Sequence, residues 1–144
     1  MFSIMKLYPF VTRLWSVVFL LSGIAFATIL VIPDYFRQLS TMTEEIVGFR
    51  NPIGEGAFWY AQTLAWVAII TFCSDRCSRN PEDKGVFYAL VTGKSVTTIV
   101  FLVVALTEDP RWFAGVLVDG FIVFSIVLSR VMYLNQISKT SESR

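Results

Sequence analysis

The chain has 144 residues and a formal net charge of +1, and 55% of its residues are hydrophobic while 16% are charged. A soluble domain carries about 25% charged residues, so this composition excludes an ordinary water-soluble protein and indicates a chain that faces lipid. The near-neutral charge argues against nucleic acid as a partner. There is no His to act as a general base, zinc ligand or haem ligand, so we expect no enzyme, no cofactor and no metal site.

The first predicted transmembrane helix covers about residues 12–32, where an uncharged run continues to Pro33. At about 1.5 Å per residue, such a run is long enough to cross a hydrocarbon core of about 30 Å. A cleaved secretory signal is the alternative, because Lys6 and Arg13 precede the run and the Ala-Phe-Ala sequence at 25–27 resembles a cleavage site. The run is longer than a typical signal core, so a permanent helix is favoured.

An extracytoplasmic loop is predicted at residues 33–55. Tyr35, Phe36, Leu39 and Met42 recur there at helical spacing, which favours a short helix lying on the membrane surface. The loop is either a docking surface for a partner or an ordinary connector.

Three further spans are predicted at about 56–75, 85–107 and 111–134, separated by short charged or proline-containing segments. Small residues recur at helical spacing in every span, which allows close helix packing. We therefore predict an all-α integral membrane protein with a single domain over residues 1–144, folded as an up-down-up-down bundle of four transmembrane helices.

The orientation follows from the distribution of basic residues. Most basic residues lie in the amino-terminal tail, the second loop and the carboxy-terminal region; these are Lys6, Arg13, Arg76, Arg79, Lys84, Arg130, Lys139 and Arg144. The first and third loops hold fewer, namely Arg37, Arg50 and Arg111. The positive-inside rule then predicts that both termini are cytoplasmic.

Lys94 and Asp119 are the unusual residues, because each lies near the middle of a predicted span. A charged side chain at the centre of a transmembrane helix costs about 2.5–3.5 kcal/mol on insertion scales. The short connection makes the third and fourth spans antiparallel neighbours, and the two positions then differ in depth by about 7–8 Å at the helical rise. We predict that the pair meets inside the bundle, as a structural staple or as a proton or ion relay.

Polar residues near this pair form a possible lining. They are Gln62 in the second span and Thr92, Ser95, Thr97 and Thr98 in the third. Such residues either hold helices together or line a narrow wet path. Cys73 and Cys77 are four residues apart, and without His or further Cys we expect free thiols.

Small size, short loops and the missing catalytic constellation favour a non-catalytic accessory or assembly subunit of a membrane complex. The alternative is a small proton- or ion-coupled transporter or channel subunit that uses Lys94 and Asp119. The expected partners are membrane lipid and other membrane subunits or a second copy, and the expected location is the cell membrane, crossed several times.

Overall fold

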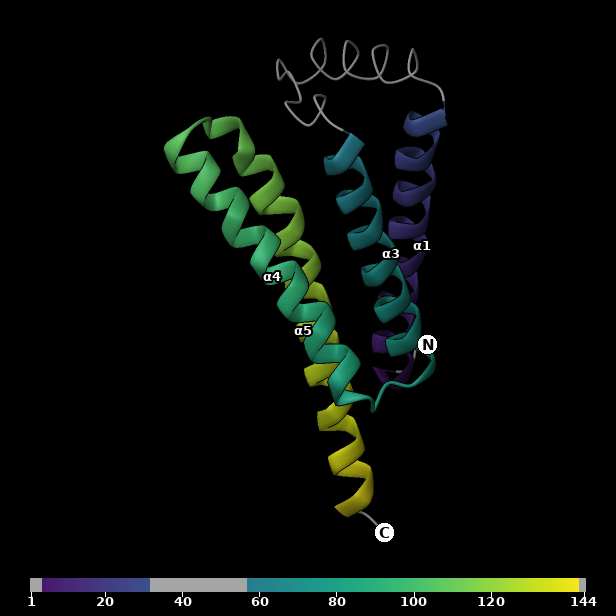
Figure 1. Ribbon diagram of the computed structural model, residues 1–144. Coiled ribbons are helices and arrows are strands. Elements are labelled where there is room, and N and C mark those ends of the chain that lie inside the picture. The colour runs from purple at the N-terminus through teal and green to yellow at the C-terminus, as the bar shows by residue number, and fades with distance from the viewer. Residues whose placement is uncertain (1–3, 32–56, 143–144) are drawn as a thin grey trace. The chain divides into compact units, whose positions relative to one another are not determined.

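The computed structural model describes residues 4–31 and 57–142, and all regular structure in this part of the chain is helical (Figure 1). Its helices are α1 (Ile4–Val31), α3 (Ala57–Arg79), α4 (Lys84–Thr107) and α5 (Phe113–Glu142), with the short 3-10 helix η2 (Pro110–Trp112) before α5. Three segments in the described residues are long and apolar enough to cross a membrane, namely Met5–Thr28, Lys84–Thr107 and Pro110–Ser141. The predicted loop at 33–55 lies outside the described residues.

Three helices extend past the predicted bounds, and α3 does so by ending at Arg79 rather than near residue 75. The first begins at Ile4 rather than near residue 12 and contains Pro9, and the last continues to Glu142 rather than ending near residue 134. The predicted bounds followed the uncharged runs, which indicate the part of a helix that can lie in lipid. Backbone hydrogen bonds continue a helix through polar residues as well, so the helices are longer than the runs. Pro9 is the sixth residue of α1, so the helix lacks the N–H that would bond the Met5 carbonyl oxygen.

The chain divides into two compact units. The first comprises Met1–Val17 and Ile70–Arg144, and the second comprises Val18–Ile69. In the second unit α1 and α3 approach each other at Gly23, where a Cβ atom would lie 3.1 Å from Cγ1 of Val67. A small residue is what such a close approach between helices requires.

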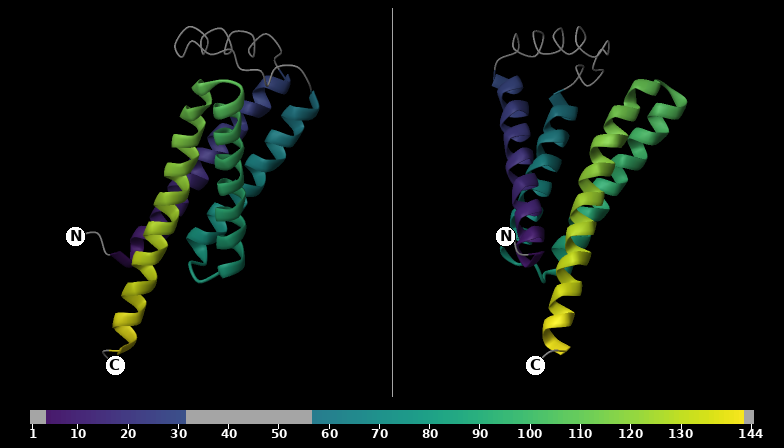
Figure 2. Two further views of the ribbon diagram at one scale, coloured as in Figure 1. Left: turned by 90° about the vertical axis from the view of Figure 1, so that its left-hand side faces the viewer. Right: turned by 180° about the vertical axis from the view of Figure 1, so that it is seen from behind.

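In the first unit, α4 and α5 lie side by side as an antiparallel hairpin (Figure 2). Polar side chains define the ends of these elements. The Asp83 carboxylate accepts from the Val86 N–H at 3.1 Å and caps α4, and the Asp109 carboxylate accepts from the Arg111 N–H at 2.9 Å and begins η2. These caps satisfy N–H groups that have no partner inside the helix.

The hairpin is packed tightly near its turn. The Phe101 ring stacks on the Trp112 ring with a centroid separation of 5.4 Å. A Cβ atom on Gly115 would lie 2.9 Å from Cδ2 of Phe101, whereas one on Gly120 would lie 4.0 Å from Cγ2 of Thr98. Gly115 is therefore required by packing, and Gly120 is not.

We expect Gly115→Ala to destabilise the chain by about 1–3 kcal/mol, because the stacked Phe101 ring must move to admit a methyl group. The matched control is Gly120→Ala, whose methyl group makes an ordinary contact and removes a helix-interior glycine, so it should be neutral or mildly stabilising. Thermal unfolding in detergent compares the two variants. Equal midpoints would contradict this account of the packing.

The last part of α5 extends beyond the beginning of α4, as Figure 1 shows. Tyr133 is the last residue of α5 that is buried, and it packs against the Tyr8 ring at 5.9 Å between centroids. The described side chains that follow it are half-buried or exposed and most of them are polar. The helix thus continues past its last buried residue.

Candidate functional site

Lys94 and Asp119 meet across the α4–α5 hairpin, as their spacing predicts. The Lys94 Nζ atom donates to the Asp119 Oδ1 atom at 2.8 Å. The two side chains are 13% and 9% exposed, so water reaches neither of them freely. Removing either partner of such a shielded pair leaves the other charge without a counter-charge, which is strongly destabilising.

Thr97 completes the pair. Its hydroxyl lies 2.6 Å from the Asp119 Oδ2 atom and 2.9 Å from the Lys94 carbonyl oxygen. A hydroxyl has one proton, and the shorter contact to a charged acceptor is the stronger of the two, so we assign that proton to Asp119. Each carboxylate oxygen of Asp119 then accepts a hydrogen bond from α4.

The other predicted lining residues on α4 have no contact to the Asp119 carboxylate among those found in the described residues. The Thr98 hydroxyl donates to the Lys94 carbonyl oxygen at 2.8 Å, which is a bond within its own helix. Ser95 is half-buried on α4, and Thr92 is exposed there. Gln62 is exposed on α3 and belongs to the second unit. Of the predicted lining residues on α4, Thr97 bonds the Asp119 carboxylate and Thr98 bonds the Lys94 carbonyl oxygen.

This arrangement fixes the register of two antiparallel helices. A proton relay would in addition need a chain of groups that carries the proton onward. Among the described residues the interactions found for Asp119 run to Lys94 and Thr97, both on α4. The geometry is thus that of an interhelical clamp between α4 and α5.

A second buried charge, Arg130, was missed by the sequence reasoning, which counted it among the cytoplasmic flanking residues. Arg130 is 4% exposed. Its Nη1 atom donates to the Tyr8 hydroxyl at 3.1 Å and to the Pro81 carbonyl oxygen at 2.9 Å, and its guanidinium carbon lies 4.2 Å from the centroid of the Phe87 ring. We call Tyr8, Pro81 and Phe87 the Arg130 cage.

The cage holds the cation with neutral groups. In residues 4–31 and 57–142 no ion pair to Arg130 is found, and the aromatic face of Phe87 and the two oxygen acceptors take the place of a carboxylate. One signal in the sequence pointed to it, because apolar residues continue after Arg130 at Val131, Met132 and Tyr133. A basic residue that is followed by apolar residues does not mark the end of a membrane span.

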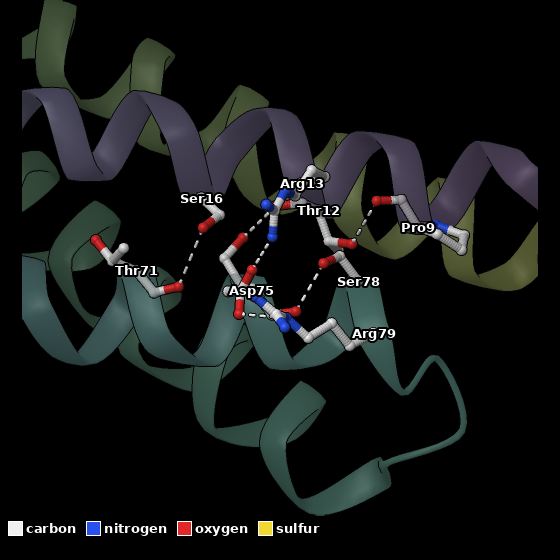
Figure 3. A network of polar contacts seen from close by, with 9 residues as sticks. Pro9, Thr12, Arg13, Ser16, Thr71, Asp75, Ser78 and Arg79 are labelled. Carbon is white, nitrogen blue, oxygen red and sulfur yellow. Dashed lines mark hydrogen bonds and ion pairs between the residues drawn. The ribbon is translucent and has the colours of Figure 1, made fainter.

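Polar contacts also join α1 to α3 within the first unit (Figure 3). The Ser74 hydroxyl donates to the Thr12 carbonyl oxygen at 2.7 Å, and Arg13 forms an ion pair with Asp75. Nearby, the Trp15 Nε1 atom donates to the Ser125 hydroxyl at 2.9 Å and so links α1 to α5. The amino-terminal half of α1 therefore contributes partners to both helices.

Cys73 and Cys77 are both buried free thiols on α3, as the sequence reasoning expected. In the part of the chain that the structure describes, no group of three or more Cys, Asp or Glu side chains is placed to hold a metal ion.

Asp109, at the turn of the hairpin, is held by Arg111 through the backbone N–H and the guanidinium, the shortest contact being 2.7 Å. These bonds favour the charged form, so the pKa of Asp109 lies below its ordinary value. A lowered pKa means that the bonds stabilise the chain at neutral pH and stop doing so as the pH falls through that pKa.

We expect the Asp109 carboxyl to titrate below an ordinary aspartate, and Arg111→Gln to raise its midpoint. Carbon-detected NMR titration of the labelled side chain measures both values. An unchanged midpoint in the variant would show that Arg111 does not set it.

Comparison of this chain with protein-family models, with curated proteins and with solved structures finds no match.

Proposed function

We propose that the chain is a multi-pass protein of the cell membrane that crosses the bilayer four times, with both termini cytoplasmic. Three segments meet the length and hydropathy criteria for a span, and α3 is the proposed fourth. In support, α1 and α3 pack antiparallel, since Thr12 pairs with Ser74 and Gly23 approaches Val67. If α1 crosses the membrane, an antiparallel α3 of 23 residues returns the chain to the starting side.

We also infer that α1 remains part of the working protein rather than being removed as a signal. Its residues supply Tyr8 to the Arg130 cage, Arg13 to Asp75 and Trp15 to Ser125. Cleavage after Ala27 would remove all three and leave a buried guanidinium without one of its acceptors, which costs stability.

The proposed role is that of a non-catalytic accessory or assembly subunit of a membrane complex. The observation that carries this proposal is the Lys94, Thr97 and Asp119 cluster, which joins α4 to α5 through both carboxylate oxygens of Asp119. A site that acts on a substrate needs several polar groups converging on a free position. Here Lys94 and Thr97 both donate to Asp119.

The test is isolation of the tagged chain from its native membrane in a gentle detergent, followed by measurement of the mass and composition of what elutes. We expect a larger complex with other subunits in fixed ratio. The control variant Leu117→Ala changes an exposed side chain on α5 and should elute in the same way. A chain that elutes alone or only with copies of itself would contradict the subunit role.

Proton- or ion-coupled transport is the second candidate, and the shielded charges of Lys94 and Asp119 favour it. The two candidates differ in what the purified chain does by itself. Reconstituted into vesicles with a pH or potential gradient, a transporter dissipates the gradient, and an accessory subunit does not. Flux that disappears in the Lys94→Met and Asp119→Leu double variant would establish transport.

A further inference from the structure

Asp75 on α3 lies between two arginines. Arg13 of α1 forms an ion pair with its Oδ1 atom, and the Arg79 Nε atom donates to its Oδ2 atom at 2.8 Å (Figure 3). The two arginine side chains are 55% and 67% exposed. Two cations share one anion, so this Arg13–Asp75–Arg79 cluster has an excess charge of +1 and remains open to its surroundings.

The cluster lies where two apolar segments end. Arg13 comes directly before the uncharged run at 14–32, and Asp75 comes directly after the uncharged run at 56–74. In a chain that crosses the bilayer at both runs, these residues lie at the level of the lipid headgroups. The proposed four-span topology thus puts the cluster at the depth of lipid phosphate groups.

The neighbouring charges do not cancel the excess. Arg76 faces Asp83, with its Nε atom 4.0 Å from the carboxylate. The turn before α4 adds Glu82 and Lys84, which carry opposite charges. These four residues are neutral as a set, so the Arg13–Asp75–Arg79 cluster keeps its positive charge.

We propose that this cluster binds the phosphate group of an anionic membrane lipid. A guanidinium has five N–H donors in a planar fork that suits phosphate oxygens. In the bonds to Asp75, Arg13 uses an Nη1 donor and Arg79 uses its Nε donor, which leaves donors on both guanidiniums. One phosphodiester then neutralises the excess charge, whereas a zwitterionic lipid brings its own cation and leaves the excess in place.

The proposal depends on insertion into a membrane and not on the accessory role. A chain that elutes without partners would therefore leave it standing, and the absence of lipid preference would leave the subunit role standing.

The experiment reconstitutes the purified chain into phosphatidylcholine bilayers that contain a trace of spin-labelled phosphatidylglycerol or spin-labelled phosphatidylcholine. Electron paramagnetic resonance gives the fraction of each label held at the protein surface. We expect the anionic label to associate more strongly, by on the order of fivefold for each excess basic group. The Arg13→Gln and Arg79→Gln double variant should lose this preference.

Two further variants make the result decisive. Asp75→Asn keeps both arginines and raises the charge of the cluster to +2, so the preference for the anionic label should increase, which a misfolded protein would not show. Arg111→Gln removes an arginine that is paired with Asp109 at 2.7 Å at the turn of the hairpin, and it should change the preference little.

Equal association of the two labels with the unmodified chain would overturn the proposal, as would a preference that survives the double arginine variant. Inorganic phosphate is added in a final arm at constant ionic strength. Retention of the preference supports a lipid ligand, and its loss would show that the site takes free phosphate instead.

Discussion

Replacing Asp119 alone with Leu is expected to destabilise the chain by about 3–5 kcal/mol, because it leaves the Lys94 ammonium shielded and without its counter-charge. Lys94→Met should have an effect of similar size, since it strands the carboxylate. The Lys94→Met and Asp119→Leu double variant should recover most of the loss, because two apolar side chains of similar volume replace a pair whose desolvation is costly. The recovery is the specific sign of a direct contact.

Thermal unfolding of the purified variants in one detergent, together with their yield in the membrane fraction, measures these effects. Val118→Leu is the matched control, because Val118 is exposed on the same helix one residue before Asp119, and its midpoint should not move. If the double variant were as unstable as the sum of the two single variants, Lys94 and Asp119 would be independent of each other.

Replacing Arg130 with Met should destabilise the chain by about 3 kcal/mol. Hydrogen bonds to a charged group contribute about 1.5–3 kcal/mol, and a desolvated cation–π contact contributes about 2 kcal/mol. Part of this is offset because an apolar side chain fills the same space. Tyr8→Phe, which removes one acceptor of the Arg130 cage, should cost about 1 kcal/mol.

The matched control is Arg79→Met, because Arg79 is an exposed arginine in an i,i+4 pair with Asp75, and such surface pairs contribute less than about 1 kcal/mol. Chemical denaturation in mixed micelles, monitored by Trp fluorescence, compares the variants. If the Arg130→Met variant were as stable against denaturation as the Arg79→Met variant, the cage would not hold the guanidinium in solution.

The sequence was most informative where a short connection fixed the register. Because few residues separate α4 from α5, the depths of Lys94 and Asp119 could be compared before any coordinates were known, and the two side chains meet. The rotation of each helix was not accessible in that way. Thr97 and Thr92 are the same residue type on the same helix, yet Thr97 bonds Asp119 and Thr92 is exposed.

Arg130 could not be placed from the sequence because its burial depends on residues distant in the chain. Tyr8 is 122 residues away from it and Pro81 is 49 residues away, and no local pattern brings these three together. Charge counting treated every basic residue near the end of a span as solvated. The structure separates Arg130, which is caged, from Lys139, which is exposed.

The continuous helix at the end of α5 has a practical consequence. From Leu134 to Glu142 the chain rises about 13 Å at the helical repeat, beyond the residues that pack on α1. A fluorescent or affinity domain joined directly after Ser141 would therefore follow a short helical stalk, and its orientation would report the direction of α5.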